Sequence, residues 1–173
     1  MNLDSYFNYL KEFATDHKQI LHDPATPRFF RVDIEELDNA LRSKANYPLV
    51  AALNPTISTG ASISTNTRKN YQGALLLLNT IKDKGNAVER STKEDVLWTI
   101  AEDFITKFIN DRRSYDIANK KYVLSGLDLN GFTLELVPES YTSMCGVLVG
   151  FRFNEALSAF DASRWNNQSR YQV

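Results

Sequence analysis

The chain has few cysteines and histidines, residues on which many secreted proteins and enzymes depend. Its 173 residues include one cysteine and two histidines. A single cysteine cannot close an intrachain disulfide, so we exclude a disulfide scaffold and expect a reducing compartment. Cys145 stands among apolar residues, and we interpret it as a small buried hydrophobic residue, with a nucleophile as the alternative.

Long hydrophobic runs are also absent. No apolar run is longer than that of residues 74–78, which has five residues, whereas a membrane-spanning helix needs about 20 residues. The first residues, MNLDSYFNYLKEF, lack the basic and apolar regions of a secretory signal. We therefore expect no membrane partner and synthesis in a cytoplasm.

The charge is balanced. Lys and Arg number 20 and Asp and Glu 21, for a formal net charge of −1. This balance excludes a basic protein that wraps nucleic acid, and it gives little long-range attraction to DNA or anionic lipid. Apolar residues make up 43%, which is typical of a globular domain.

The titratable side chains form no catalytic or metal-binding motif. His17 and His22 lie five residues apart, whereas metal-binding histidines on a helix lie closer, as in His-Glu-x-x-His. The acidic pairs are adjacent residues, which point about 100° apart on a helix. They suit the first turns of helices better than acid–base catalysis. We therefore expect no catalytic residue, no cofactor and no metal.

Three segments predict helices. Apolar residues recur every three or four positions over residues 3–22 and from Thr92 to about residue 114. Asp103 and Lys107, four apart in the second segment, predict an ion pair. A shorter helix is predicted to begin after Asp33 and to end near residue 45.

Strands are predicted between these helices. Residues 29–32 form a short apolar run, and residues 48–81 predict a long β-hairpin with its tip at Gly60 or near Asn66. Inside it, the continuous apolar run 74–78 indicates cover on both faces or packing in an assembly.

The last third predicts a second hairpin. Asn130-Gly131 is a turn signal, and the strand that follows it alternates apolar and polar residues. A later strand, residues 146–153, places Val147, Val149, Phe151 and Phe153 on one face.

Together these elements predict an α+β fold: a mainly antiparallel sheet with a long β-hairpin, packed against two to three helices. We expect a single domain over residues 1–160. Residues 161–173 are expected to form a polar C-terminal extension, which is either a frayed terminus or a docking segment.

The order helix, short strand, helix, long hairpin, helix, hairpin resembles that of tail-terminator and tail-completion proteins of tailed bacteriophages. Neck-ring proteins of the head–tail junction, including those of crAss-like phages, are similar. The resemblance covers about residues 3–155 and is carried by the amphipathic start 3–21, the Ser/Thr-rich arm between Leu53 and Tyr71, and the strands 74–78 and 146–153.

This resemblance implies a virion structural protein, assembled in the host cytoplasm, that acts in the phage neck or tail. Its protomers would form a homo-oligomeric ring around a DNA channel, with non-specific passage of DNA through the lumen. Adjacent connector, portal or tail proteins would be its other partners, and it would not be an enzyme.

The hairpin suggests how such a ring would assemble. A long hairpin gains stability by pairing with a neighbour's edge, and head-to-tail contacts that close make a ring. The predicted oligomer interface is Thr56, Ile57, Ser58, Ile63, Ser64, Thr65, Trp165 and Tyr171.

A second hypothesis belongs to another class. The chain would then be a cytoplasmic α+β enzyme or a regulatory binding domain. An apolar pocket with a perturbed acid, Glu135 or Asp103, at its wall would favour it.

Overall fold

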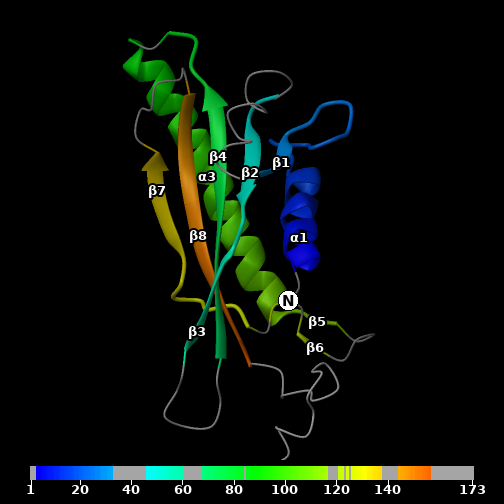
Figure 1. The fold of residues 1–173 in the computed structure, drawn as a ribbon. Helices are drawn as coiled ribbons and strands as arrows, with labels where there is room; N and C mark the ends of the chain where they lie inside the picture. Colours follow the sequence, from blue (N-terminus) through cyan, green and yellow to red (C-terminus); the bar gives the residue numbers. More distant parts are fainter. Residues whose placement is uncertain are drawn as a thin grey trace, which may run out of the picture.

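The computed structural model describes residues 3–32, 46–60, 68–83, 85–116, 121–122, 124, 126–137 and 144–156. Within these residues two helices lie on one face of a six-stranded sheet (Figure 1). The helices are α1 (Leu3–Asp16) and α3 (Ala87–Arg113). The strands of the sheet are β1 (Phe29–Val32), β2 (Leu49–Leu53), β3 (Thr56–Gly60), β4 (Arg68–Thr80), β7 (Thr133–Val137) and β8 (Met144–Ala156).

The sheet follows the order β1-β2-β4-β8-β7, and β3 pairs with β4 beyond the end of β2. Only β1 and β2 run parallel; the other pairs are antiparallel. β4 and β8 pair along 13 residues each and form the spine of the sheet. A separate small ladder joins β5 (Tyr115–Asp116) to β6 (Lys121–Tyr122). The predicted α+β class, the mainly antiparallel sheet and the long hairpin are confirmed.

The main core lies between the sheet and the helices. The four residues predicted to share one face of the late strand, Val147, Val149, Phe151 and Phe153, are all buried. They pack in one cluster with α3 side chains, among them Phe104 and Phe108. Burying a side chain of this size is worth about 1.5–3 kcal/mol, so this face stabilises the body strongly.

The part of the sheet formed by β2 and residues 75–78 of β4 is covered on both faces. Along β2, Val50 and Ala52 belong to the main core, while Leu49 and Ala51 belong to a second apolar cluster. β4 alternates in the same way, with Leu75 in the main core and Leu78 in the second cluster. This explains the continuous apolar run, for which we predicted cover on both faces or packing in an assembly, by the first of these two alternatives.

The first helix is shorter than predicted, because α1 ends at Asp16. The chain turns at residues 17–20, where the Gln19 N–H donates to Nδ1 of His17 at 3.3 Å. Leu21 then adopts a positive φ of 50°, which is incompatible with continuing a right-handed helix. The apolar spacing predicted a helix that is too long, because it does not detect where the backbone changes conformation.

The second long helix begins earlier than predicted, at Ala87 rather than Thr92. Asn86 is its N-cap, and its Oδ1 accepts from the Glu89 N–H at 2.9 Å. The predicted ion pair between Asp103 and Lys107 is wrong. Lys107 Nζ lies 2.9 Å from Asp111 Oδ2, whereas Asp103 lies beside a histidine described below.

Several predictions fall outside the described residues. They are the helix over residues 34–45, the hairpin tip with Ile63, Ser64 and Thr65, and the C-terminal extension with Trp165 and Tyr171. Neither of the two described helices has the length and apolar character needed to cross a membrane.

Candidate functional site

The lower part of the sheet forms a three-stranded arm, which we define as β3, residues 68–72 of β4 and residues 152–156 of β8. In Figure 1 the arm extends beyond the lower ends of α1 and α3. Thr56 pairs with Gln72, and Gln72 pairs with Arg152, so the three strands are in register across the arm.

A β-bulge separates the arm from the body. Ala52 pairs with Leu75 and Thr56 pairs with Gln72, so three residues, 53–55, face two, 73–74. The inserted segment contains Pro55, which has no N–H to offer to a ladder. The extra residue reverses the alternation of side chains. As a result Ala52 points into the core, whereas Thr56 shares the opposite face with Gln72 and Arg152.

A tyrosine from α1 fastens the bulge. The Tyr6 hydroxyl lies 3.1 Å from the Leu53 carbonyl oxygen and 3.4 Å from that of Ala74, and it donates to this pair. The side chain is 5% exposed, and burial raises the pKa of Tyr6 above its ordinary value. This hydroxyl therefore satisfies backbone carbonyls where the β2–β4 ladder is interrupted.

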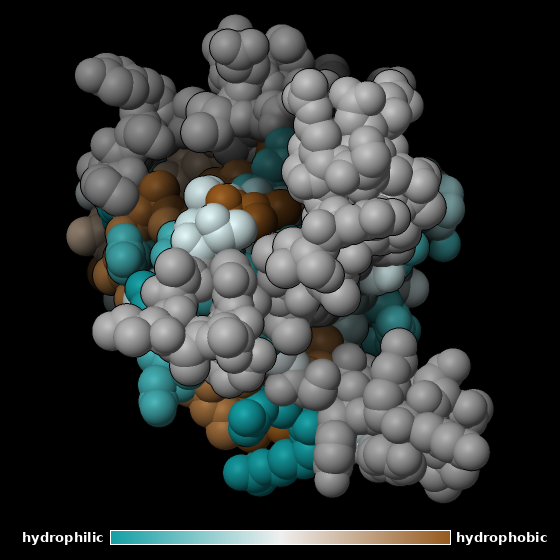
Figure 2. Space-filling view, turned by 60° about the horizontal axis from the view of Figure 1, so that its bottom comes forward, coloured by the Kyte–Doolittle hydropathy of each residue, from teal (hydrophilic) through white to brown (hydrophobic). Residues whose placement is uncertain are grey.

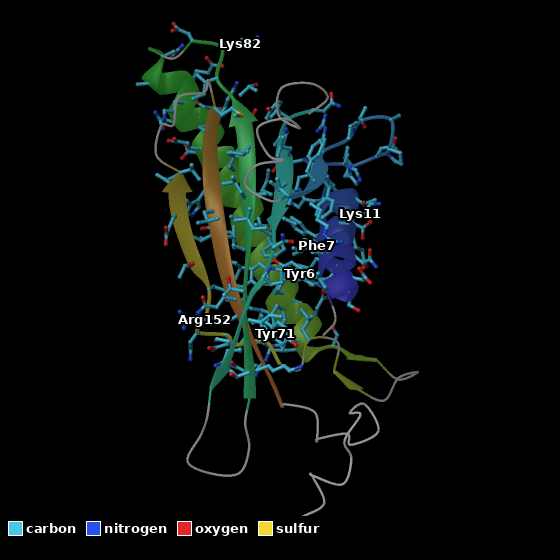
Figure 3. The ribbon with its side chains drawn as sticks, viewed as in Figure 1. Tyr6, Phe7, Lys11, Tyr71, Lys82 and Arg152 are labelled. Carbon is cyan, nitrogen blue, oxygen red and sulfur yellow. The ribbon has the colours of Figure 1, made fainter. Side chains whose placement is uncertain are left out.

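Gly73 allows this contact. A Cβ at this position would lie 2.7 Å from Cζ of Phe151 and 2.9 Å from Cε2 of Tyr6. Figure 3 shows Tyr6 on α1 next to the sheet, with Tyr71 below it in the arm. The joint between body and arm is thus fixed by a glycine, a tyrosine and a bulge.

One edge of the arm is closed. Along β8, the Asp128 N–H donates to the Arg152 carbonyl at 2.9 Å, and the Asn154 N–H donates to the Gly126 carbonyl at 2.7 Å. Leu127 forms a bridge to Phe153 between them. These contacts occupy the β8 edge of the arm.

The other edge, β3, is open among the described residues. β3 pairs with β4 on one side and with no second described strand. The side chains of Thr56, Ile57, Ser58 and Thr59 are exposed, and Ile57 is 56% exposed. β3 contains no charged residue and no proline. Natural proteins usually protect an exposed edge with charges or proline, because unprotected edges pair with other strands.

Three residues of the predicted interface are thus brought together on this open edge: Thr56, Ile57 and Ser58. The other five predicted interface residues lie outside the described residues. Seen from the arm's end of the molecule, hydrophobic and hydrophilic residues lie side by side on the surface (Figure 2).

The open face of the sheet carries a hollow of about 310 Å³ at the base of the arm. Its polar lining side chains are Asn54, Thr56, Gln72, Thr133 and Arg152. Small residues, Ala74 and Gly150, make room for it. A Cβ on Gly150 would collide with Oγ1 of Thr133. These polar groups can donate and accept hydrogen bonds, but they do not include an acid–base pair.

The sequence did not single out these hollow-lining residues, apart from Thr56. A signal was available, because Arg152 alternates with the apolar Phe151 and Phe153 and therefore had to face away from the core. Gln72 could have been placed opposite Arg152 only once the pairing of β4 with β8 was known.

A second hollow, of about 390 Å³, lies between the end of α3 and residues 126–130. Its described lining includes Arg112, Asp128 and Asn154. It is polar, and like the first hollow it has no histidine or cysteine among its described lining residues.

The acids that a catalytic hypothesis would use do not meet. Glu135 is exposed on β7, where it pairs with Leu148. Asp103 is 60% exposed on α3, and its Oδ2 lies 3.2 Å from Nε2 of His17. Neither lines either of the hollows described above.

The remaining titratable candidates, His22 and Cys145, have structural roles. Nδ1 of His22 accepts from the backbone N–H groups of Arg28 and Phe29, at 3.1 and 3.3 Å, and burial lowers the pKa of its imidazole. Cys145 is 2% exposed, which confirms it as a buried small residue, and burial raises the pKa of its thiol. Within the described residues, no three His, Cys, Asp or Glu side chains come together as metal ligands would.

No protein-family model matches the chain, and no curated protein shows significant similarity to it. The geometry of the arm and the order of the elements are therefore the grounds for a functional proposal.

Proposed function

We propose that the protein is a structural component of a phage virion that assembles into a ring in the neck or tail, using the open β3 edge of the arm. The observation that carries this proposal is an exposed, uncharged edge strand on an arm that extends beyond the helices. Edges of this kind bind another strand through their backbone groups.

The composition of the edge supports a role in binding over a role in folding. Its side chains contribute little to the packing of the core, because Thr56–Thr59 are exposed. Threonine and isoleucine favour an extended backbone, and the threonine and serine side chains add little apolar surface. Such an edge offers its backbone donors and acceptors to a partner strand.

The partners in this proposal are other copies of the chain first, and neighbouring connector, portal or tail proteins second. A head-to-tail contact makes a ring when the rotation between neighbouring copies closes, and the lumen of the ring would let DNA pass. The net charge of −1 suits a wall that does not hold DNA tightly.

The test compares the oligomeric state of three proteins by light scattering coupled to size exclusion, with negative-stain images of each. The wild type is expected to form a closed oligomer, and Ile57→Lys with Thr59→Lys is expected to remain monomeric because lysines protect edges. Val88→Lys is the matched control: Val88 is 76% exposed, far from the arm on the first turn of α3. It should assemble like the wild type.

A wild-type monomer at tens of micromolar that also binds no portal or tail component would overturn the proposal. So would a double-lysine variant that assembles like the control. Thermal unfolding of all three proteins shows whether a loss of assembly reflects the edge itself or a loss of folding.

A further inference from the structure

Among the described residues the sheet has a second open edge, β7, which pairs with β8 and lies on the opposite side of the β3-β4-β8-β7 ribbon. Neighbouring strands in this ribbon are antiparallel throughout. β3 and β7 therefore run in opposite directions. A second copy that placed its β7 beside β3 would continue the same sheet as an antiparallel pair.

We propose that β3 of one protomer pairs with β7 of a second copy, with Ile57 opposite Leu136. This inference rests on the proposed function and names the partner of the open edge. Both strands have five residues, so the pairing is complete from end to end.

The apolar residues of the two edges match. Of the exposed large hydrophobic residues in the described part of the chain, two lie on strands: Ile57, 56% exposed, and Leu136, 53% exposed. They lie on the two edge strands in question. Each would be partly covered by the other, which gives the contact an apolar centre.

The two residues also lie on the same face of the sheet. Ile57 pairs with Tyr71, which pairs with Phe153 on the helix side. Leu136 pairs with Val147, also on the helix side. Directly paired residues share a face, so placing Ile57 opposite Leu136 keeps the core face and the open face continuous across the contact.

The resulting register places Ser58 opposite Glu135, a neutral residue opposite a charged one. The competing symmetric contact of two β7 strands centred on Glu135 would place two carboxylates directly opposite each other, which is destabilising. A symmetric contact of two β3 strands would leave Leu136 exposed and would stop at a dimer. The β3–β7 contact is head-to-tail, as a ring requires.

The test uses cysteine pairs in the full chain with a short bis-maleimide, read on denaturing gels. Ser58→Cys with Glu135→Cys in one chain is expected to give a ladder of cross-linked species that ends at one size. Mixing the two single variants is expected to give cross-linked dimers. Each single variant alone is expected to run as a monomer on the denaturing gel, because it has no second cysteine at the contact. The wild type, with Cys145 2% exposed, is the background control.

The outcomes separate this inference from the proposed function. Cross-linked dimers from Ser58→Cys alone would show β3 pairing with β3, which overturns the register but keeps the open edge as a contact. Assembly by light scattering without any cross-link would also overturn the β3–β7 contact. A monomeric wild type, together with no cross-link in the Ser58→Cys, Glu135→Cys variant, would overturn both.

Discussion

The body and the arm share strands β4 and β8 but are stabilised differently. In the body, α1 and α3 cover one face, and ring centroids pack closely: 4.3 Å for Phe104–Phe108, 5.0 Å for Phe108–Phe151 and 4.9 Å for Tyr9–Phe108. In the arm, the side chains of β3 are exposed and the strand is held to β4 by the ladder.

This difference indicates where stability and where binding reside. Side-chain burial scales with the area removed from water, so the body provides most of the folding free energy. The arm has little burial on β3, and in the described part of the chain the outer backbone groups of β3 pair with no second strand. Substitutions in the body should therefore change unfolding, whereas substitutions in β3 should change association.

The largest expected effect is at the centre of the body. Phe108→Ala removes a ring that is 1% exposed and contacts rings from α1, α3, β8 and residue 132. We expect the free energy of unfolding to fall by about 3–5 kcal/mol. Denaturant titration followed by circular dichroism measures it.

Ile57→Ala is the comparison in the arm, and we expect it to change the stability of the monomer by less than about 0.5 kcal/mol. If the two substitutions had similar costs, the distinction between body and arm would be wrong.

The parts of the fold that the sequence predicted are those governed by local periodicity. The alternation in residues 147–153 identified the buried face of β8, and the three- and four-residue spacing located both described helices. The ends of these helices depended on single residues instead. Asn86 acts as a cap that extends α3 by five residues toward its start, from Thr92 to Ala87, and a positive φ at Leu21 follows the end of α1.

The site was predicted only in part. The Ser/Thr-rich segment predicted a β-hairpin and an oligomer interface that includes Thr56, Ile57 and Ser58, because β-branched residues favour strands. The bulge was not predictable, since one extra residue appears only when the β2–β4 and β3–β4 registers are compared. Arg152 and Gln72 come together through a pairing between residues far apart in the chain, which side-chain burial rather than local sequence determines.

A smaller effect is expected at the joint between body and arm. Tyr6→Phe removes the hydroxyl that satisfies the carbonyls of Leu53 and Ala74. Leaving buried carbonyls without a donor costs about 1–3 kcal/mol. Hydrogen exchange should then become faster for residues 68–72 and change less for residues 97–108 of α3.

Tyr71→Phe is the matched control, because it removes a hydroxyl from the arm without touching the bulge, and it should change stability by less than about 0.5 kcal/mol. Equal effects of the two tyrosine substitutions would mean that the hydroxyl of Tyr6 does not hold the joint.

The smallest effect is expected where the body is most distant from the arm, at the start of α3. The Glu89 carboxylate accepts from the backbone N–H groups of Lys82 and Asp83, at 3.2 and 3.3 Å, and lies 2.8 Å from Lys93 Nζ. The hydrogen bond with Lys93 and those backbone bonds lower the pKa of Glu89 from 4.5 to about 2. A carboxyl whose pKa is lower in the folded than in the unfolded chain stabilises the fold above its unfolded pKa. This stabilisation should be present above pH 4.5 and be lost as the pH falls toward about 2.

Thermal unfolding between pH 2 and 6 should therefore show a loss of stability on acidification that is smaller in Glu89→Gln. Asp95→Asn, which removes an exposed carboxylate from the same helix, should retain the acid dependence of the wild type. A Glu89→Gln protein with an unchanged pH profile would show that this carboxylate does not couple the start of α3 to the turn after β4, and the pH dependence would then have to arise elsewhere in the body.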